Sequence, residues 1–262
     1  MKPPTLARLH PGVCLAVALA AGAGSILRAA DSALHFRSGP KQTALVELFT
    51  SEGCSSCPPA EAWLNRLGAR PGLWTEFVPV ALHVNYWDHL GWRDPWAARE
   101  FTVRQRTYAA AWNSRTIYTP GLVLNGQEWR TWARDDAVPS ATAANAGRLS
   151  AQSADGRSWQ IEFTPPAPGG NVEVHIALLS RGVASDVRAG ENRGRRLKHD
   201  FVALGLTTQP MVPAGGLFRA EVSLPPEHAS PGGGRAIAVW VTPAGQLAPL
   251  QALGGELPPA GL

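Results

Sequence analysis

The feature that most constrains this chain is a strand-like segment that leads into a pair of cysteines and then into a helix start. Residues 44–50 read Ala-Leu-Val-Glu-Leu-Phe-Thr. This nearly continuous apolar run has strand length and suits a strand covered on both faces. Cys54-Ser55-Ser56-Cys57 follows, and Pro58 and Pro59 then suit the first turn of a helix, where a missing N–H costs nothing. We expect strand, C-x-x-C motif and helix in immediate succession, with the helix ending near Gly68.

Strands and helices continue to alternate as far as about residue 149. Residues 77–84 read as the next strand, and Asp94-Pro95 starts a helix that runs to about Asn113. Asn125-Gly126 favours a two-residue hairpin turn between two short strands. An alanine-rich segment predicts a last helix over residues 136–149. The predicted order over residues 42–149 is therefore β-α-β-α-β-β-α.

The pattern of residues along the sequence changes at about Ser150. Short β-rich runs are separated by clusters of Pro and Gly, which is typical of a sandwich with many turns. The runs cover residues 159–163, 172–180, 217–224 and 236–242. We therefore expect a second, β-rich domain over residues 150–262.

The N-terminus has the order of a secretory signal peptide. Lys2 and Arg8 precede an apolar run over residues 13–23, and Ala29 and Ala30 offer a small-residue cleavage site. As a helix this run spans only about half the hydrocarbon thickness of a bilayer, so we predict no permanent membrane span. We predict that residues 1–30 are a signal peptide and that the protein is exported, to the periplasm or the cell exterior.

Removal of that segment changes both the charge and the cysteine count. It leaves 21 basic against 20 acidic residues, so the mature chain offers little electrostatic reason to bind nucleic acid or an anionic membrane. It also removes Cys14 and leaves Cys54 and Cys57 as an even pair in an oxidising compartment. A disulfide that closes so short a loop stabilises a fold little, which favours a redox role.

The helix start also suggests different roles for the two cysteines. Unpaired N–H groups and the dipole at the helix start favour a thiolate, so we expect Cys54, in the exposed turn, to be the attacking nucleophile. Cys57, closer to the packed first turn, would resolve the mixed disulfide. Two other interpretations stay open. The pair could form an inert local disulfide, or half of a zinc site aided by His83 and His89.

This order of elements resembles the thioredoxin superfamily, in which a cis-proline far along the chain lies beside the C-x-x-C motif. The resemblance implies an α/β fold, with a thioredoxin-like three-layer domain followed by the small C-terminal β-sandwich domain. Pro120 occupies the place of the cis-proline, and Thr119 would offer its backbone to a substrate strand. Glu47 lies close to the position of the buried acid that helps to deprotonate the resolving cysteine, although a satisfied, partly exposed carboxylate is an equal interpretation.

A second resemblance covers nearly all of the mature chain. It is carried by residues 47–60, 83–92, 118–121 and 189–194. Through these segments the sequence looks like a bacterial secreted family called domain of unknown function 1223, which has no settled activity. Two positions, Asn85 and Gly121, depart from that family's usual Asp and Gln.

Three further groups of residues are candidates for binding. His83, Trp87 and Asp88 fall at the end of a strand, together with Tyr86, and could line a substrate groove. Eight of the ten tryptophans lie between Trp63 and Trp132, which suits either such a groove or ordinary core packing. Arg193, Arg195, Arg196, Lys198 and His199 form a basic loop that suits either an acidic partner or plain solvation.

These observations lead to three hypotheses for function. The first is an exported thiol–disulfide oxidoreductase that acts on protein or peptide thiols, or with a redox partner, through Cys54 and Cys57 and without a diffusible cofactor or metal. The second is a binding or accessory module with a structural disulfide. The third is a metal-handling protein that uses the two thiolates.

Overall fold

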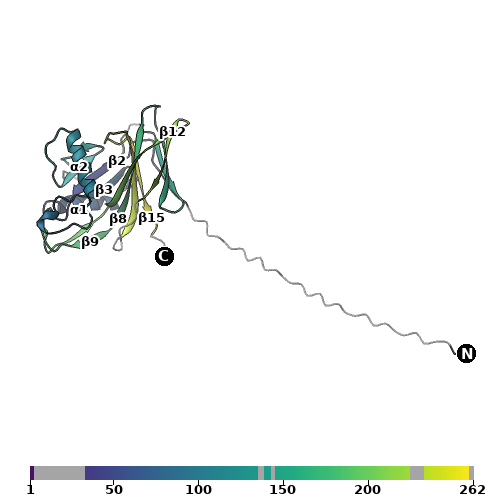
Figure 1. Ribbon diagram of the computed structural model, residues 1–262, viewed down its shortest axis with the longest axis horizontal. Coiled ribbons are helices and arrows are strands. Elements are labelled where there is room, and N and C mark those ends of the chain that lie inside the picture. The colour runs from purple at the N-terminus through teal and green to yellow at the C-terminus, as the bar shows by residue number, and fades with distance from the viewer. Residues whose placement is uncertain (3–32, 135–138, 143–144, 225–232, 260–262) are drawn as a thin grey trace. The chain divides into compact units, whose positions relative to one another are not determined.

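An eight-stranded sheet runs through most of the fold in the computed structural model, which describes residues 1–2, 33–134, 139–142, 145–224 and 233–259 (Figure 1). In spatial order its strands are β15 (Gln251–Leu257), β14 (Gly234–Pro243), β8 (Val172–Arg181), β11 (Val202–Pro210), β3 (Phe77–His83), β2 (Ala44–Thr50), β4 (Gly121–Leu124) and β5 (Gln127–Glu128). β3 pairs in parallel with both β2 and β11, and the other neighbours are antiparallel. Strands from before and after residue 150 therefore share one sheet.

Two smaller sheets and two helices complete the regular structure of the described residues. The five-stranded antiparallel sheet contains β1 (Leu34–Arg37), β6 (Arg148–Ser153), β7 (Ser158–Thr164), β13 (Leu217–Ser223) and β12 (Val212–Ala214). A two-stranded ribbon joins β9 (Val183–Asp186) to β10 (Arg196–His199). The helices are α1 (Pro58–Arg66) and α2 (Arg99–Ala111), with short 3-10 turns η1 (Leu67–Ala69) and η2 (Asp88–Leu90).

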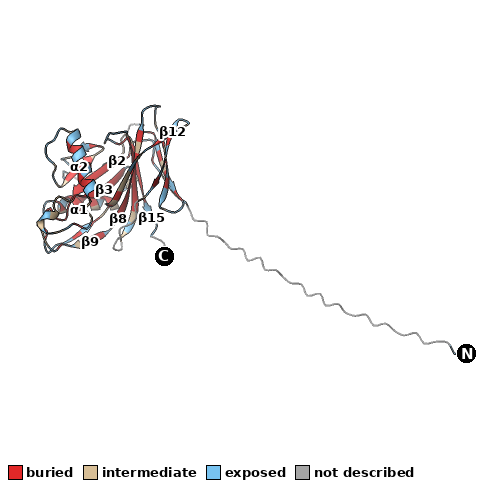
Figure 2. Cartoon of the chain, viewed as in Figure 1, coloured by how far each residue is buried: buried red, intermediate tan, exposed pale blue. Residues whose placement is uncertain are grey.

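Different elements cover the two faces of the large sheet. Side chains alternate along a strand, so Val46 and Leu48 of β2 pack with α1, whereas Leu45 and Phe49 pack on the α2 side. β8 divides in the same way, because Leu178 faces the five-stranded sheet and its neighbours along the strand face the α2 side. Figure 2 shows the resulting burial along β2, β3 and β8.

The expected fold class is wrong. We predicted an α/β, thioredoxin-like three-layer domain followed by a small β-sandwich, but the described residues are mostly strand, with α-helices of only nine and thirteen residues. The four β-rich runs after residue 150 do form strands. However, β8 and β14 are buried on both faces and extend the sheet that contains β2 and β3, while β7 and β13 form the layer that covers them.

Local predictions had mixed outcomes. The hairpin between β4 and β5 is confirmed, with positive φ at both Asn125 (48°) and Gly126 (83°), as its tight turn requires. The helix expected from Asp94 begins only at Arg99. The helix expected over residues 136–149 is wrong, because none of its described residues is helical and Arg148 and Leu149 belong to β6.

The N-terminal prediction lies almost wholly outside the described residues. Of the proposed signal peptide, residues 1–30, only Met1 and Lys2 are described. In the part of the chain that the structure describes, no helix is both long enough and apolar enough to cross a bilayer.

Candidate functional site

The C-x-x-C motif lies where strand, loop and helix were predicted to meet. β2 ends at Thr50, the cysteines follow in the loop, and α1 begins at Pro58. Cys57 is the N-cap residue of α1, and its carbonyl oxygen accepts hydrogen bonds from the N–H groups of Ala60 (2.9 Å) and Glu61 (3.1 Å). This succession of elements fixes both cysteines at one end of the central strands.

The two thiols are free, and both are fully buried. Cys54 and Cys57 each have 0% exposure, although Ser55 and Ser56 between them are exposed. We expected Cys54 in an exposed turn, so that expectation is wrong. Its Sγ lies 3.3 Å from the Ser56 hydroxyl and 3.7 Å from the Thr119 carbonyl oxygen. A partner can reach this sulfur only if the segment around it moves.

The electrostatics of the two thiols differ sharply. A hydrogen bond from the Cys57 thiol is the main cause that lowers the pKa of Cys54 to about 6, and burial opposes it. Burial raises the pKa of Cys57 far above its usual value, and the neighbouring Cys54 adds to this rise. At neutral pH the pair is therefore a Cys54 thiolate held by a Cys57 thiol.

The segment around Pro120 lies beside the cysteines, as predicted. The Thr119–Pro120 peptide bond is cis. The Thr119 carbonyl oxygen faces Cys54, and it accepts a hydrogen bond from Ser56 (3.4 Å). The indole N–H of Trp87 donates to the Thr119 hydroxyl at 2.8 Å. Thr119, Pro120 and Trp87 therefore meet at the motif.

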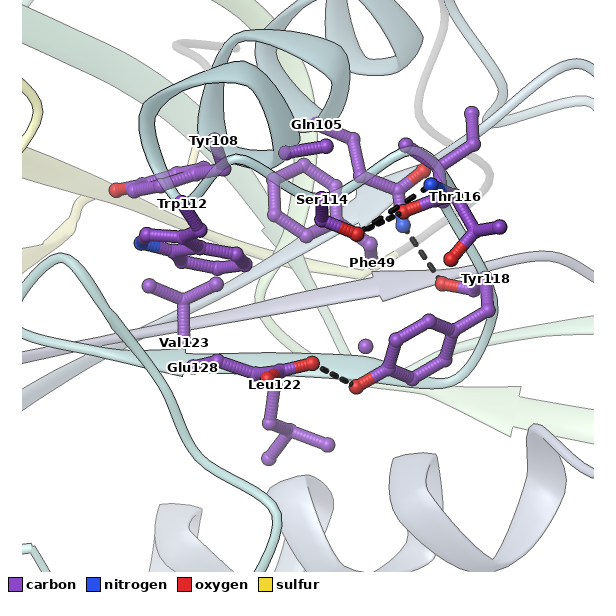
Figure 3. A pocket seen from close by; sticks show the side chains of 13 residues that line it. Phe49, Gln105, Tyr108, Trp112, Ser114, Thr116, Tyr118, Leu122, Val123 and Glu128 are labelled. Carbon is purple, nitrogen blue, oxygen red and sulfur yellow. Dashed lines mark hydrogen bonds between the residues drawn. The ribbon is translucent and has the colours of Figure 1, made fainter.

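A small cavity lies on the far side of this segment, between α2 and β4 (Figure 3). Its volume is about 30 Å³, which has room for only about one or two water molecules. In Figure 3 the Gln105 side chain reaches the Tyr118 carbonyl, at 2.7 Å, and the Tyr118 hydroxyl meets Glu128. These contacts hold the segment in place, and the cavity is too small to be a substrate pocket.

Glu47 does not lie with the cysteines. Its carboxylate accepts a hydrogen bond from Arg104 of α2 at 2.5 Å and another from the Tyr108 hydroxyl. Thr50, three positions further along β2, faces the opposite side of the strand, where its hydroxyl donates to Glu61 of α1 at 2.5 Å. Thr50 also contacts Cys57, so Glu61 is connected to the resolving cysteine through this shared neighbour.

His83 is buried, whereas Asp88, in the loop after β3, is half-buried. His83, at the end of β3, is 0% exposed, and its Nδ1 lies 2.8 Å from the carboxylate of Asp94. Asp88 accepts a hydrogen bond from the Asp94 N–H at 3.2 Å. Both residues hold the loop after β3.

The tryptophan-rich region and the basic loop were both predicted as candidate binding groups, and their residues lie in different surroundings. Trp63 packs edge-on against Trp129 and Trp132 beneath α1, which is core packing. The arginines of the basic loop are exposed, but His199 at its end is buried.

A buried polar network beneath the motif is the part that the sequence analysis missed. His199 of β10 donates from Nδ1 to Glu61 (2.5 Å) and from Nε2 to Glu52 (2.9 Å). Burial opposes the charge on this imidazole, but the two carboxylates outweigh it and raise its pKa to about 10. Glu52 also accepts a hydrogen bond from the Trp92 indole at 2.7 Å. Alternation along Arg196-Leu197-Lys198-His199 was the available signal, because it places Leu197 and His199 on the inner face.

The loop between β9 and β10 also holds the C-x-x-C motif in place through hydrogen bonds. The Asn192 amide donates to the carbonyl oxygens of Glu52 and Cys54, both at 2.9 Å. Glu191 accepts hydrogen bonds from the N–H (2.9 Å) and hydroxyl (2.6 Å) of Ser55. Residues far along the chain therefore fix the backbone around the cysteines.

One cluster in the described part of the chain has donor atoms arranged as metal ligands could be. Glu61, His83 and His199 each offer one such atom, all within 4.8 Å of one another, and all three residues are buried. This cluster does not include either cysteine, so it differs from the zinc half-site considered on sequence grounds.

Fold and site together define a β-rich protein with a buried dithiol at the end of a central strand. The chain belongs to the family described as "Protein of unknown function (DUF1223)", which its sequence matches over residues 45–242. The crystal structure of protein AGR_C_4864 from Agrobacterium tumefaciens is similar, with 25% identity, a TM-score of 0.58, and coverage of 86% of this chain and 98% of that one. HBP35 of Porphyromonas gingivalis shares the fold at 11% identity and a TM-score of 0.55, over 84% of this chain and 76% of that one. A search of curated proteins found no significant match.

Proposed function

We propose that this protein is an exported thiol–disulfide oxidoreductase that acts on protein or peptide thiols through Cys54 and Cys57, with no diffusible cofactor. The observation that carries the proposal is the asymmetry of the pair. Cys54 has a pKa of about 6, mainly because the Cys57 thiol donates to it, whereas burial keeps Cys57 protonated. A nucleophilic thiolate beside a resolving thiol is the arrangement that disulfide exchange requires.

The reaction has two exchange steps. The Cys54 thiolate attacks one sulfur of a partner disulfide, a Cys54–partner bond forms, and the other partner sulfur leaves as a thiolate that takes a proton from solvent. Cys57 then attacks the Cys54 sulfur while its proton passes to the departing partner sulfur. The Cys54–partner bond breaks, and the Cys54–Cys57 disulfide forms. The partner gains two electrons and the pair loses two. The same steps in reverse oxidise a partner dithiol.

The surroundings of the pair support this role. The Thr119 carbonyl and Ser56 hydroxyl both lie beside Cys54 Sγ, at 3.7 Å and 3.3 Å. Trp87 holds the Thr119 side chain. We infer that Thr119 and Pro120 border the surface where a partner strand binds, once the segment around Ser56 moves. Glu47, paired with Arg104 on the other side of β2, takes no part in this mechanism.

Trapping of the mixed disulfide tests the proposal. In purified Cys57→Ser protein the first exchange can occur but the second cannot, so we expect a stable adduct with a small peptide that contains one disulfide. The matched variant Cys54→Ser keeps only the Cys57 thiol, whose pKa burial raises, and should form at least tenfold less adduct. Intact-mass spectrometry measures both. Equal and slow adduct formation in the two variants would falsify the redox assignment.

The burial of both cysteines favours one competing function. A binding or accessory module with a structural disulfide needs no exposed sulfur, and both side chains have 0% exposure. For such a module, reduction of the pair should leave partner binding unchanged and neither cysteine should exchange. The trapping experiment therefore separates the two candidates.

A further inference from the structure

We propose that Glu61, His83 and His199 form a binding site for one divalent transition-metal ion of the zinc class, separate from the dithiol. The three residues come from α1, β3 and β10, and their side chains converge beneath the C-x-x-C motif. Two imidazoles and one carboxylate are a common ligand set for zinc and its neighbours, whereas calcium and magnesium prefer oxygen ligands alone.

His83 supplies the first argument. Its Nδ1 is held by Asp94 at 2.8 Å, which leaves Nε2 as its donor atom toward the cluster. This Nε2 is buried and has no hydrogen-bond partner among the residues that the structure describes. A buried polar atom without a partner costs about 1–3 kcal/mol, so its retention calls for an explanation. A metal ion that accepts the Nε2 lone pair provides one.

The groups behind the two histidines supply the second argument. Histidines that bind metals usually donate their other ring N–H to a carboxylate, which fixes the tautomer and orients the ring. Asp94 stands in that position for His83, and Glu52 stands there for His199, 2.9 Å from its Nε2. Both histidines therefore already have the carboxylate partner that is typical of a metal ligand.

The charge of the cluster gives the third argument. Glu52, Glu61 and Asp94 bring three negative charges into a buried region, and their side-chain partners are the two histidines, Thr50 and Trp92. Buried charges in proteins are paired or bind metal ions, and a divalent cation held by Glu61 and the two histidines would offset part of this negative charge.

The geometry needs a small rearrangement of side chains. Ligand atoms around a tetrahedral zinc ion lie about 3.3 Å apart, and the three donors here lie within 4.8 Å of one another. The His199 Nδ1 and the Glu61 oxygen, now 2.5 Å apart, would separate by under about 1 Å, and donors that are farther apart would approach by up to about 1.5 Å. Three protein donors leave one position for a water molecule or the second oxygen of Glu61.

Metal binding in a protein without the two thiols tests the proposal independently of redox activity. We would purify the exported Cys54→Ser/Cys57→Ser protein, dialyse it against equimolar ZnCl₂ and then metal-free buffer, and measure zinc by elemental analysis. We expect about one ion per chain and a higher melting temperature. With Co²⁺ we expect visible d–d bands without the near-ultraviolet charge-transfer band that thiolate ligands give.

A matched pair of histidine variants locates the site. In the same background, His83→Gln should weaken Zn²⁺ affinity at least tenfold, whereas His35→Gln, which changes an exposed histidine on β1, should leave it unchanged. If His83→Gln protein does not fold, the parent protein still decides the question. Retention of less than about a tenth of an ion per chain, with no change in melting temperature, overturns the proposal. Equal affinity in folded His83→Gln protein also overturns it.

Discussion

At the scale of single residues, the site depends on one hydrogen bond between two thiols. From the sequence, the helix start is the expected cause of the low pKa of Cys54, but the main cause in the structure is the Cys57 thiol. Each cysteine therefore sets the state of the other, and neither can be understood alone. This dependence leads to a prediction that a helix-start effect would not produce.

The pH dependence of alkylation should report this bond. With a pKa of about 6, Cys54 is mostly thiolate at pH 7, and its reactivity is lost as the pH falls through that value. We expect a midpoint near 6 for iodoacetamide labelling of Cys54, followed by peptide mapping, at a rate that burial keeps low. Cys57→Ala should move the midpoint toward the ~8.5 of a free cysteine. Cys57→Ser, which keeps a donor, should move it less. A wild-type midpoint above 8 would contradict this account.

At the scale of elements, α2 is attached to the sheet by a buried ion pair. Arg104 pairs with Glu47 of β2, and its guanidinium also lies 5.1 Å from the ring of Trp240 on β14. The helix is thereby joined to two strands that are far apart in the sequence. Removal of one partner leaves a buried charge without its counterion, which is expensive.

Arg104→Met should therefore destabilise the protein by about 3–5 kcal/mol. Arg106→Met, on the exposed face of the same helix, is the control and should change stability by less than about 0.5 kcal/mol. Urea unfolding followed by tryptophan fluorescence measures both.

If Glu47 has no role at the cysteines, Glu47→Gln should leave the pH midpoint for alkylation of Cys54 unchanged. A shifted midpoint would restore the role that the sequence suggested for this acid.

Prediction from sequence succeeded where the signal was local. The strand over residues 44–50, the helix after Pro58 and the Asn125-Gly126 hairpin each follow from neighbouring residues, and all are present. It failed where a partner far along the chain decides the outcome. Whether β8 begins a new domain or extends the first sheet depends on pairing with β11, and the burial of His199 depends on β10 folding over α1. Periodicity along one segment does not contain that information.

At the scale of the whole molecule, the shared sheet makes the two halves of the chain depend on each other. β11 follows residue 150 in the sequence, yet it pairs with β3, which belongs to the first half. Without the second half, β3 would become an edge strand and the α2 side of the sheet would lose the residues of β8 and β14 that pack there.

A fragment of residues 33–149 should therefore not fold on its own. We expect it to lack a cooperative thermal transition and to bind a hydrophobic dye, whereas residues 33–262 should unfold in one transition. Circular dichroism and dye fluorescence measure these properties. A cooperative transition in the short fragment would show that the first half is an independent domain, which the shared sheet argues against.

The hydrogen bonds from Asn192 also have a consequence for the order in which the protein is made. Asn192 follows Cys54 by 138 positions, so the cysteines emerge from the ribosome long before the residue that fixes their backbone. His199, which completes the network beneath them, emerges later still. Through most of synthesis the two thiols are therefore open to any oxidant that they meet, and only the last third of the chain closes over them. The compartment where the chain folds over the cysteines therefore sets whether the Cys54–Cys57 pair is reduced or oxidised in the newly folded protein.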